Sequence, residues 1–96
     1  MNSLRNIPLF CCGKIVATPG ALALLEQVQK SPSEFLSRHL RGDWGELCQE
    51  DRAENELSLK HDFRLLSSYP VTETDTLWII TEADRSVTTL LLPSEY

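Results

Sequence analysis

The spacing of apolar positions near the start of the chain changes from that of a strand to that of a helix. Residues 13–18 carry β-branched side chains at their centre, which predicts a short strand. Residues 21–30 then repeat apolar side chains every three or four positions, which predicts an amphipathic helix. Thr18 is a suitable N-cap for this helix, and Pro19 is a suitable first helical residue.

Two more helices are predicted before residue 62. Ser31, Pro32 and Glu34 stand at the spacing of a capping box, followed by a short apolar face. Gly42 would end that second helix in a left-handed conformation. Residues 49–60 begin with acidic side chains, which suit a helix N-terminus, and predict a third, rather exposed helix.

After residue 62 the pattern becomes that of strands. Runs rich in apolar, β-branched and aromatic residues cover 63–71, 76–82 and 87–92. Polar turns at 72–75 and 83–86 separate them. Connections this short imply that neighbouring strands run antiparallel.

The order of these elements predicts a single α+β domain. Ninety-six residues are enough for one domain and too few for two. We expect a β-α-α-α-β-β-β arrangement over residues 13–96, with a mostly antiparallel four-stranded sheet packed against helices. Residues 1–12 are expected to form a poorly ordered lead-in.

The charge balance narrows the range of partners. The chain has 14 Asp and Glu against 9 Lys and Arg, a net charge of −5. Proteins that bind nucleic acid non-specifically neutralise phosphates with Lys and Arg, and here these residues are few and scattered. The acidic balance therefore favours another protein as partner over direct non-specific nucleic-acid binding.

The cysteines and the short apolar stretch near the start bear on location. Residues 7–12 are apolar, but this stretch is too short to span a membrane and is interrupted by Pro8. Cys11, Cys12 and Cys48 are odd in number, and two are adjacent, which makes a poor disulfide framework. We expect a cytoplasmic protein with reduced thiols and no membrane contact.

No metal, cofactor or catalytic residue is predicted. The chain has no C-x-x-C or H-x-x-x-H spacing of the kind that zinc sites use. We interpret His39 and His61 as surface histidines and the thiols as lying in or near the core. A pairing of Cys48 with either histidine has no supporting sequence context.

One turn has the position of an anion site. Thr18-Pro19-Gly20 opens a helix directly after a strand, where backbone N–H groups can hold an anion. A single glycine is weak evidence for a phosphate cradle. The alternative is a well-capped strand–helix turn.

The segment 42–46 is the leading candidate for a binding surface. Gly42 and Gly45 bracket Trp44, which indicates a fixed backbone shape. Trp44 either plugs one end of the core or anchors a partner, since tryptophan is enriched at interface hot spots. The candidate binding residues of the chain are Asp43, Trp44, Glu46 and Arg85.

Three stretches, residues 13–22, 42–45 and 78–96, together resemble a family of small bacterial proteins carried on plasmids and integrative elements. The resemblance covers about residues 13–96. It implies a mobile-element setting and no catalytic residues.

A second likeness concerns topology. A strand, helices and a three-strand meander are similar to the plan of the RelE/ParE toxins, which are ribosome-dependent ribonucleases. That likeness implies functional Arg, Lys, His or Tyr residues on the sheet, and the candidates are Arg64, Arg85 and Tyr96. Those toxins are usually basic, whereas this chain is acidic.

Three hypotheses for the function follow. The first is a non-enzymatic protein that binds another protein through the surface around Trp44 and the acidic third helix. The second is a toxin that acts on RNA. The third is an antirestriction or anti-CRISPR type inhibitor, which would need a contiguous negative face.

Overall fold

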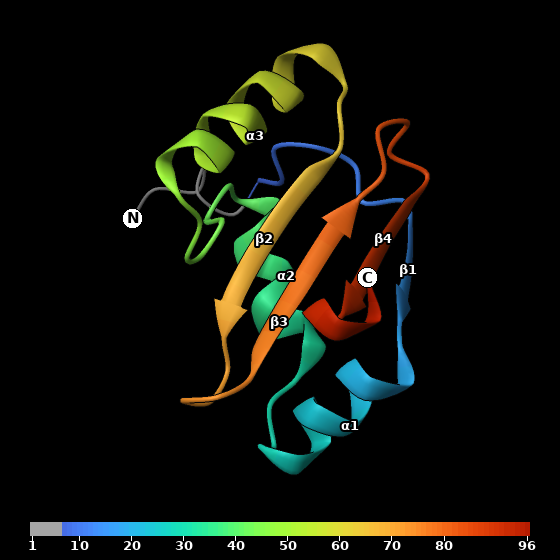
Figure 1. Cartoon of the computed structure of the whole chain (residues 1–96). Helices are drawn as coiled ribbons and strands as arrows, with labels where there is room; N and C mark the ends of the chain where they lie inside the picture. Colours follow the sequence, from blue (N-terminus) through green and yellow to red (C-terminus); the bar gives the residue numbers. More distant parts are fainter. Residues whose placement is uncertain (1–6) are drawn as a thin grey trace.

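A computed structural model describes residues 7–96, in which helices pack against a four-stranded sheet (Figure 1). The predicted α+β architecture and the predicted order of elements are confirmed, with boundaries shifted by up to three residues. The elements are β1 (Lys14–Ala17), α1 (Pro19–Gln27), α2 (Pro32–Leu40), α3 (Gln49–His61), β2 (Leu65–Pro70), β3 (Thr76–Thr81), β4 (Val87–Leu91) and a 3-10 helix, η2 (Pro93–Glu95).

The sheet is mixed, with strand order β1-β4-β3-β2. The pairs β2–β3 and β3–β4 are antiparallel, as the short turns predicted. β1 pairs with β4 in parallel, with Lys14 opposite Val87. A parallel neighbour needs a long crossover connection, and the three helices with β2 and β3, which lie between β1 and β4 in the sequence, provide the length.

The core lies between the sheet and helices α1 and α2. Side chains alternate along a strand, so every second residue of β2, β3 and β4 points at the helices. Figure 1 shows α2 behind the sheet in that view. The central apolar cluster consists of Ala21, Leu25, Phe35, Tyr69, Leu77, Ile79 and Leu90.

The helix start predicted at Thr18 forms as expected, and the one predicted at Ser31 forms in part. The Thr18 hydroxyl accepts a hydrogen bond from the first turn of α1 at 3.2 Å, and the Ser31 hydroxyl does the same for α2 at 3.3 Å. The capping box expected at Ser31 is incomplete. The Glu34 carboxylate lies instead 3.5 Å from the Lys30 ammonium, one helical turn away.

Of the lead-in expected over residues 1–12, the first six lie outside the described residues. The remainder has no regular secondary structure but is attached to the domain. The Leu9 N–H donates to the Leu40 carbonyl at 2.8 Å, and the Thr88 hydroxyl donates to the Cys12 carbonyl at 2.7 Å. Within residues 7–96, each helix is too short or too polar to cross a membrane.

Candidate functional site

Trp44 is buried, with 2% of its surface exposed. Its ring stacks on Phe10 at 6.4 Å and meets the His39 ring edge-on at 5.8 Å, measured between ring centroids. The indole N–H donates to the Glu56 carboxylate at 3.1 Å. Of the two interpretations of Trp44, the structure therefore supports the plug at one end of the core, and this side chain presents no anchor to a partner.

Asp43 organises the backbone around Trp44. Its carboxylate lies 2.7 Å from the Arg38 guanidinium and accepts a hydrogen bond from the Gly45 N–H at 3.3 Å. The hydrogen bond with Arg38, reinforced by that of Gly45, lowers the pKa of Asp43. The Tyr69 hydroxyl donates to the Asp43 carbonyl at 2.6 Å. These contacts give Asp43 a role in shaping the loop.

The loop that contains Trp44 covers the outer edge of β2. The Ser68 N–H donates to the Trp44 carbonyl at 2.9 Å, and the Glu46 N–H donates to the Ser68 carbonyl at 2.7 Å. Gly45, at φ +75°, forms the bridge to Ser68, and a Cβ here would lie 2.1 Å from the Ser68 carbonyl oxygen. Glu46 itself is exposed.

Arg85 lies at the other end of β3 and has a structural role. Its side chain is 13% exposed and donates to the carbonyls of Ser58 at 2.8 Å and Phe63 at 2.7 Å. These bonds fasten the β3–β4 turn to the end of α3. The Arg85 guanidinium also lies 5.7 Å from the centroid of the Phe10 ring, which stacks on Trp44, so Phe10 lies between two of the four predicted binding residues.

His39 is fully buried, which makes the interpretation as a surface histidine wrong. Its Nδ1 lies 2.5 Å from the Ser67 hydroxyl, and its Nε2 lies 2.9 Å from the Thr81 hydroxyl. Thr81 in turn lies 2.8 Å from the Thr88 hydroxyl, which donates to the Cys12 carbonyl. This chain of hydrogen bonds crosses the helix-facing side of the sheet.

The direction of that chain sets the tautomer of His39. The one hydroxyl proton of Thr88 goes to a carbonyl, so Thr81 must donate to Thr88 and His39 Nε2–H must donate to Thr81. Nδ1 then accepts from Ser67, and every group is satisfied with a neutral imidazole. Burial, with the nearby Arg85 charge, lowers the pKa of His39 to about 4, which agrees with a neutral ring.

The predicted positions of the thiols need correction as well. Cys11 and Cys48 are exposed and Cys12 is half-buried, so two of the three lie at the surface. Within the described residues 7–96, no three His, Cys, Asp or Glu side chains are grouped closely enough to hold a metal ion.

The anion position at the start of α1 is filled by the chain itself. The Glu95 carboxylate accepts hydrogen bonds from the Thr18 hydroxyl at 2.5 Å and the Gly20 N–H at 3.2 Å. It also accepts one from the Leu92 N–H at 2.8 Å. These hydrogen bonds, led by that of Thr18, lower the pKa of Glu95. The turn thus fastens η2 to α1.

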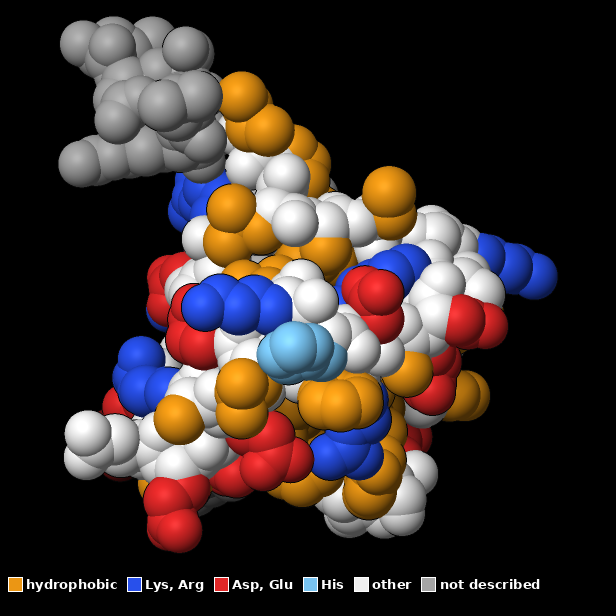
Figure 2. All heavy atoms as spheres, turned by 90° about the horizontal axis from the view of Figure 1, so that it is seen from above, with side chains coloured by type: hydrophobic (Ala, Val, Ile, Leu, Met, Phe, Trp, Pro, Cys, Tyr) orange, Lys and Arg blue, Asp and Glu red, His pale blue; other side chains and the backbone are white. Residues whose placement is uncertain are grey.

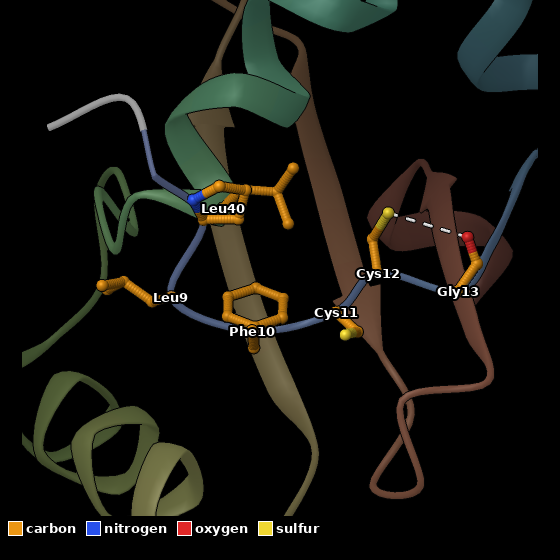
Figure 3. Close-up of a pocket in the computed structure, with 7 residues that line it drawn as sticks. Leu9, Phe10, Cys11, Cys12, Gly13 and Leu40 are labelled. Carbon is orange, nitrogen blue, oxygen red and sulfur yellow. Dashed lines mark hydrogen bonds between the residues drawn. The ribbon is translucent and has the colours of Figure 1, made fainter. Parts of the chain in front are cut away.

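A shallow apolar hollow lies beside the N-terminal segment (Figure 3). It has a volume of about 580 Å³. Figure 3 shows the Cys11 and Cys12 side chains pointing to different sides of the backbone. The hollow is lined by Pro8, Leu9, Phe10, Cys11, Cys12, Gly13 and Leu40. None of these residues is charged, so the hollow indicates no particular ligand.

Helix α3 packs on the sheet with polar side chains. Its buried residues are Asn55 and Ser58, whereas Leu57 is 52% exposed. The Asn55 side-chain amide donates to the Leu66 carbonyl at 2.6 Å and accepts from the Leu66 N–H at 3.1 Å. This contact holds the helix by hydrogen bonds, and the helix leaves Ala53 and Leu57 exposed while Leu59 is half-buried.

The outward side chains of α3 border a second hollow, of about 380 Å³. Phe63, which follows the helix, closes it and is 56% exposed. Viewed from this end of the molecule, hydrophobic side chains lie at the surface among acidic and basic ones (Figure 2). We name this surface the α3 patch; it consists of Glu50, Ala53, Glu54, Leu57 and Phe63.

The sequence predicted α3 as an acidic, exposed helix, but it did not predict that Ala53 and Leu57 face outward. The signal was present in its spacing. Ala53 and Leu57 are one turn apart, while Asn55 and Ser58, also one turn apart, occupy a different face. No family model, curated protein or solved structure matches the chain.

Proposed function

We propose that the protein is a non-enzymatic interaction module that binds another protein through the α3 patch. The supporting observation is the reversed polarity of α3, which buries Asn55 and Ser58 and exposes Leu57. Full burial of a Leu or Phe side chain is worth roughly 1.5–3 kcal/mol. Leu57 and Phe63 are about half exposed, so the fold leaves about half of that free energy unused, and a partner covering them would recover it.

This proposal changes the residues assigned to the surface. The sequence pointed to Trp44 and the acidic third helix together, and only the helix contributes exposed apolar side chains. Trp44 supports the surface indirectly, because its indole N–H holds Glu56 of α3 at 3.1 Å.

The toxin hypothesis is the second candidate, because one observation favours it. The Arg64 guanidinium donates to the Tyr96 hydroxyl and lies 5.7 Å from the ring centroid, so two of its three candidate residues meet. Arg85, the third, is committed to backbone carbonyls. High-level expression should arrest growth if this hypothesis holds, and Arg64→Ala should relieve the arrest. Harmless wild-type expression would exclude it.

The inhibitor hypothesis receives less support. It requires a contiguous negative face, and on the face shown in Figure 2 acidic and basic side chains are interspersed. The mobile-element setting and the cytoplasmic location stay predictions from the sequence.

Copurification from the native host tests the interaction proposal. The tagged full chain should recover the same protein repeatedly, and Leu57→Asp should lower recovery at least about tenfold, roughly 1.4 kcal/mol in affinity. Leu22→Asp is the matched control, because Leu22 is 50% exposed on α1, outside the patch. Failure to recover any protein reproducibly would contradict the proposal, as would equal recovery with both variants. Circular dichroism confirms that each variant is folded.

A further inference from the structure

The edge of β2 next to the α3 patch has its backbone groups already paired. Asn55 satisfies both the N–H and the carbonyl of Leu66, and the 44–46 loop satisfies those of Ser68. A partner strand adds to a sheet through free N–H and carbonyl groups on its edge. Because these positions offer none, a partner at the α3 patch has to bind through side chains, as a helix in a groove does.

The two carboxylates of the α3 patch favour a partner with positive charge. Glu50 and Glu54 are one turn apart on α3, and like charges at this spacing repel by a few tenths of a kcal/mol. In the part of the chain that is described, neither carboxylate has an ion pair. Two Lys or Arg side chains one turn apart on a partner helix would match them.

The apolar part of the patch has a matching spacing. Ala53 and Leu57 are also one turn apart, on the same side of α3 as the two carboxylates, and Phe63 faces them across the hollow. The volume of the hollow, about 380 Å³, lies at the small end of the roughly 300–1,000 Å³ range of ligand pockets. It suits large apolar side chains entering from a neighbouring helix.

A second copy of this chain is a poor occupant. In a twofold dimer the same patch meets itself, so the four carboxylates of the two protomers would share one interface to which the patch contributes no Lys or Arg. Like charges brought together at an interface cost several kcal/mol.

From these observations, and resting on the proposed function, we infer that the partner presents a basic amphipathic helix to the α3 patch. That helix carries large apolar residues one turn apart, flanked on one side by Lys or Arg one turn apart. The apolar residues enter the hollow between Leu57 and Phe63, and the basic residues pair with Glu50 and Glu54.

Two synthetic helical peptides test this inference against the full chain. Both carry the same leucine face, and one has arginine on the flank where the other has glutamate. In a titration of the ¹⁵N-labelled protein, the arginine peptide should shift the amide resonances of α3 and Phe63, with a Kd on the order of 10–100 μM. The glutamate peptide should bind at least about tenfold more weakly.

Charge reversal supplies the specific control. The double variant Glu50→Lys with Glu54→Lys should reverse the preference between the two peptides. The variant Glu26→Lys with Glu73→Lys makes the same change in net charge at exposed positions outside the patch and should leave the preference intact. Raising the salt concentration should weaken binding of the arginine peptide to the wild-type chain. It should also reduce the preference of the double variant for the glutamate peptide.

The inference is overturned if the two peptides bind alike, if neither binds, or if the shifts map away from α3. Its failure is distinguishable from failure of the proposed function. Copurification that still depends on Leu57, with no preference for the arginine peptide, would reject only the basic helix. Copurification that is insensitive to Leu57→Asp would reject both.

Discussion

The side-chain amide of Asn55 forms two hydrogen bonds with the backbone of Leu66, one in each direction. The amide thus pairs with β2 as the backbone of a further strand would. This contact attaches α3 to the sheet in place of an apolar interface, and it leaves Leu57 free to face outward.

Replacing Asn55 with alanine should therefore weaken the whole domain. The change leaves the N–H and carbonyl of Leu66 without partners, at roughly 1–3 kcal/mol for each unsatisfied buried group. Because Leu66 is only half-buried, we expect a loss in the lower part of the summed range, about 2–4 kcal/mol in the free energy of unfolding, measured by urea denaturation. Lys60→Ala, an exposed change on the same helix, should stay within about 0.5 kcal/mol. Equal effects of the two substitutions would contradict this role for Asn55.

His39 should make the domain sensitive to acid. Its pKa is about 4 in the folded chain against 6.5 for the free group, so the unfolded chain binds more protons between these values. Its contribution to stability is complete above about pH 6.5 and falls as the pH drops toward 4. The expected loss is about 1.4 kcal/mol at pH 5.5, from the linkage relation.

Urea denaturation of wild type and His39→Gln across this pH range isolates the effect. The pKa values of Asp43 and Glu95 are lowered, so the stability lost on their protonation appears only at more acidic pH, and both proteins share it. The variant is expected to be less stable at neutral pH and to lose less stability between pH 7 and 5. Parallel curves for the two proteins would show that His39 is not the acid-sensitive group.

The two glycines that bracket Trp44 should differ in their tolerance of alanine. Both have positive φ, but a Cβ at Gly45 meets the Ser68 carbonyl at 2.1 Å, and one at Gly42 meets only the tip of Leu9 at 2.9 Å. Gly42→Ala should cost about 1–2 kcal/mol for the left-handed backbone. Gly45→Ala should cost more than about 3 kcal/mol, because backbone must move. Thermal melting compares them, and a larger loss for Gly42→Ala would be incompatible with the loop geometry.

Glu95 should stabilise the domain only when ionised. Its lowered pKa means that the contribution is present above about pH 4.5 and fades as the pH falls. Glu95→Gln should lower the Tm at pH 7, and the difference from wild type should shrink near pH 4. A constant difference at both pH values would argue for a neutral hydrogen bond instead.

Local signals explain what could be predicted. Thr18 with Pro19, and Ser31 with Pro32, start helices through contacts within the next three residues, so adjacent sequence contains all the information needed. The apolar, β-branched and aromatic runs that predicted the last three strands are equally local. Short turns then made their antiparallel pairing predictable.

The burial of His39 depended on residues far along the chain. Its partners Ser67 and Thr81 come from β2 and β3, and no local pattern joins them to α2. The sequence contains one indication, because each hydroxyl lies two residues from a buried apolar residue of its strand and therefore on the same face of the sheet. Hydroxyls on a core-facing side need a polar partner, and a histidine at the end of an amphipathic helix can supply one.

The parallel pairing of β1 with β4 has a consequence during synthesis of the chain. Among the strands of residues 7–96, β1 is translated first, yet the strand that it pairs with, β4, is translated last. Until the ribosome has added β4, the apolar residues of α1, such as Leu25, have an incomplete surface to pack on. The nascent chain therefore completes its core only after β4 is added, and a ribosome that stalls between β3 and β4 would leave an open edge on β3 that is exposed to aggregation.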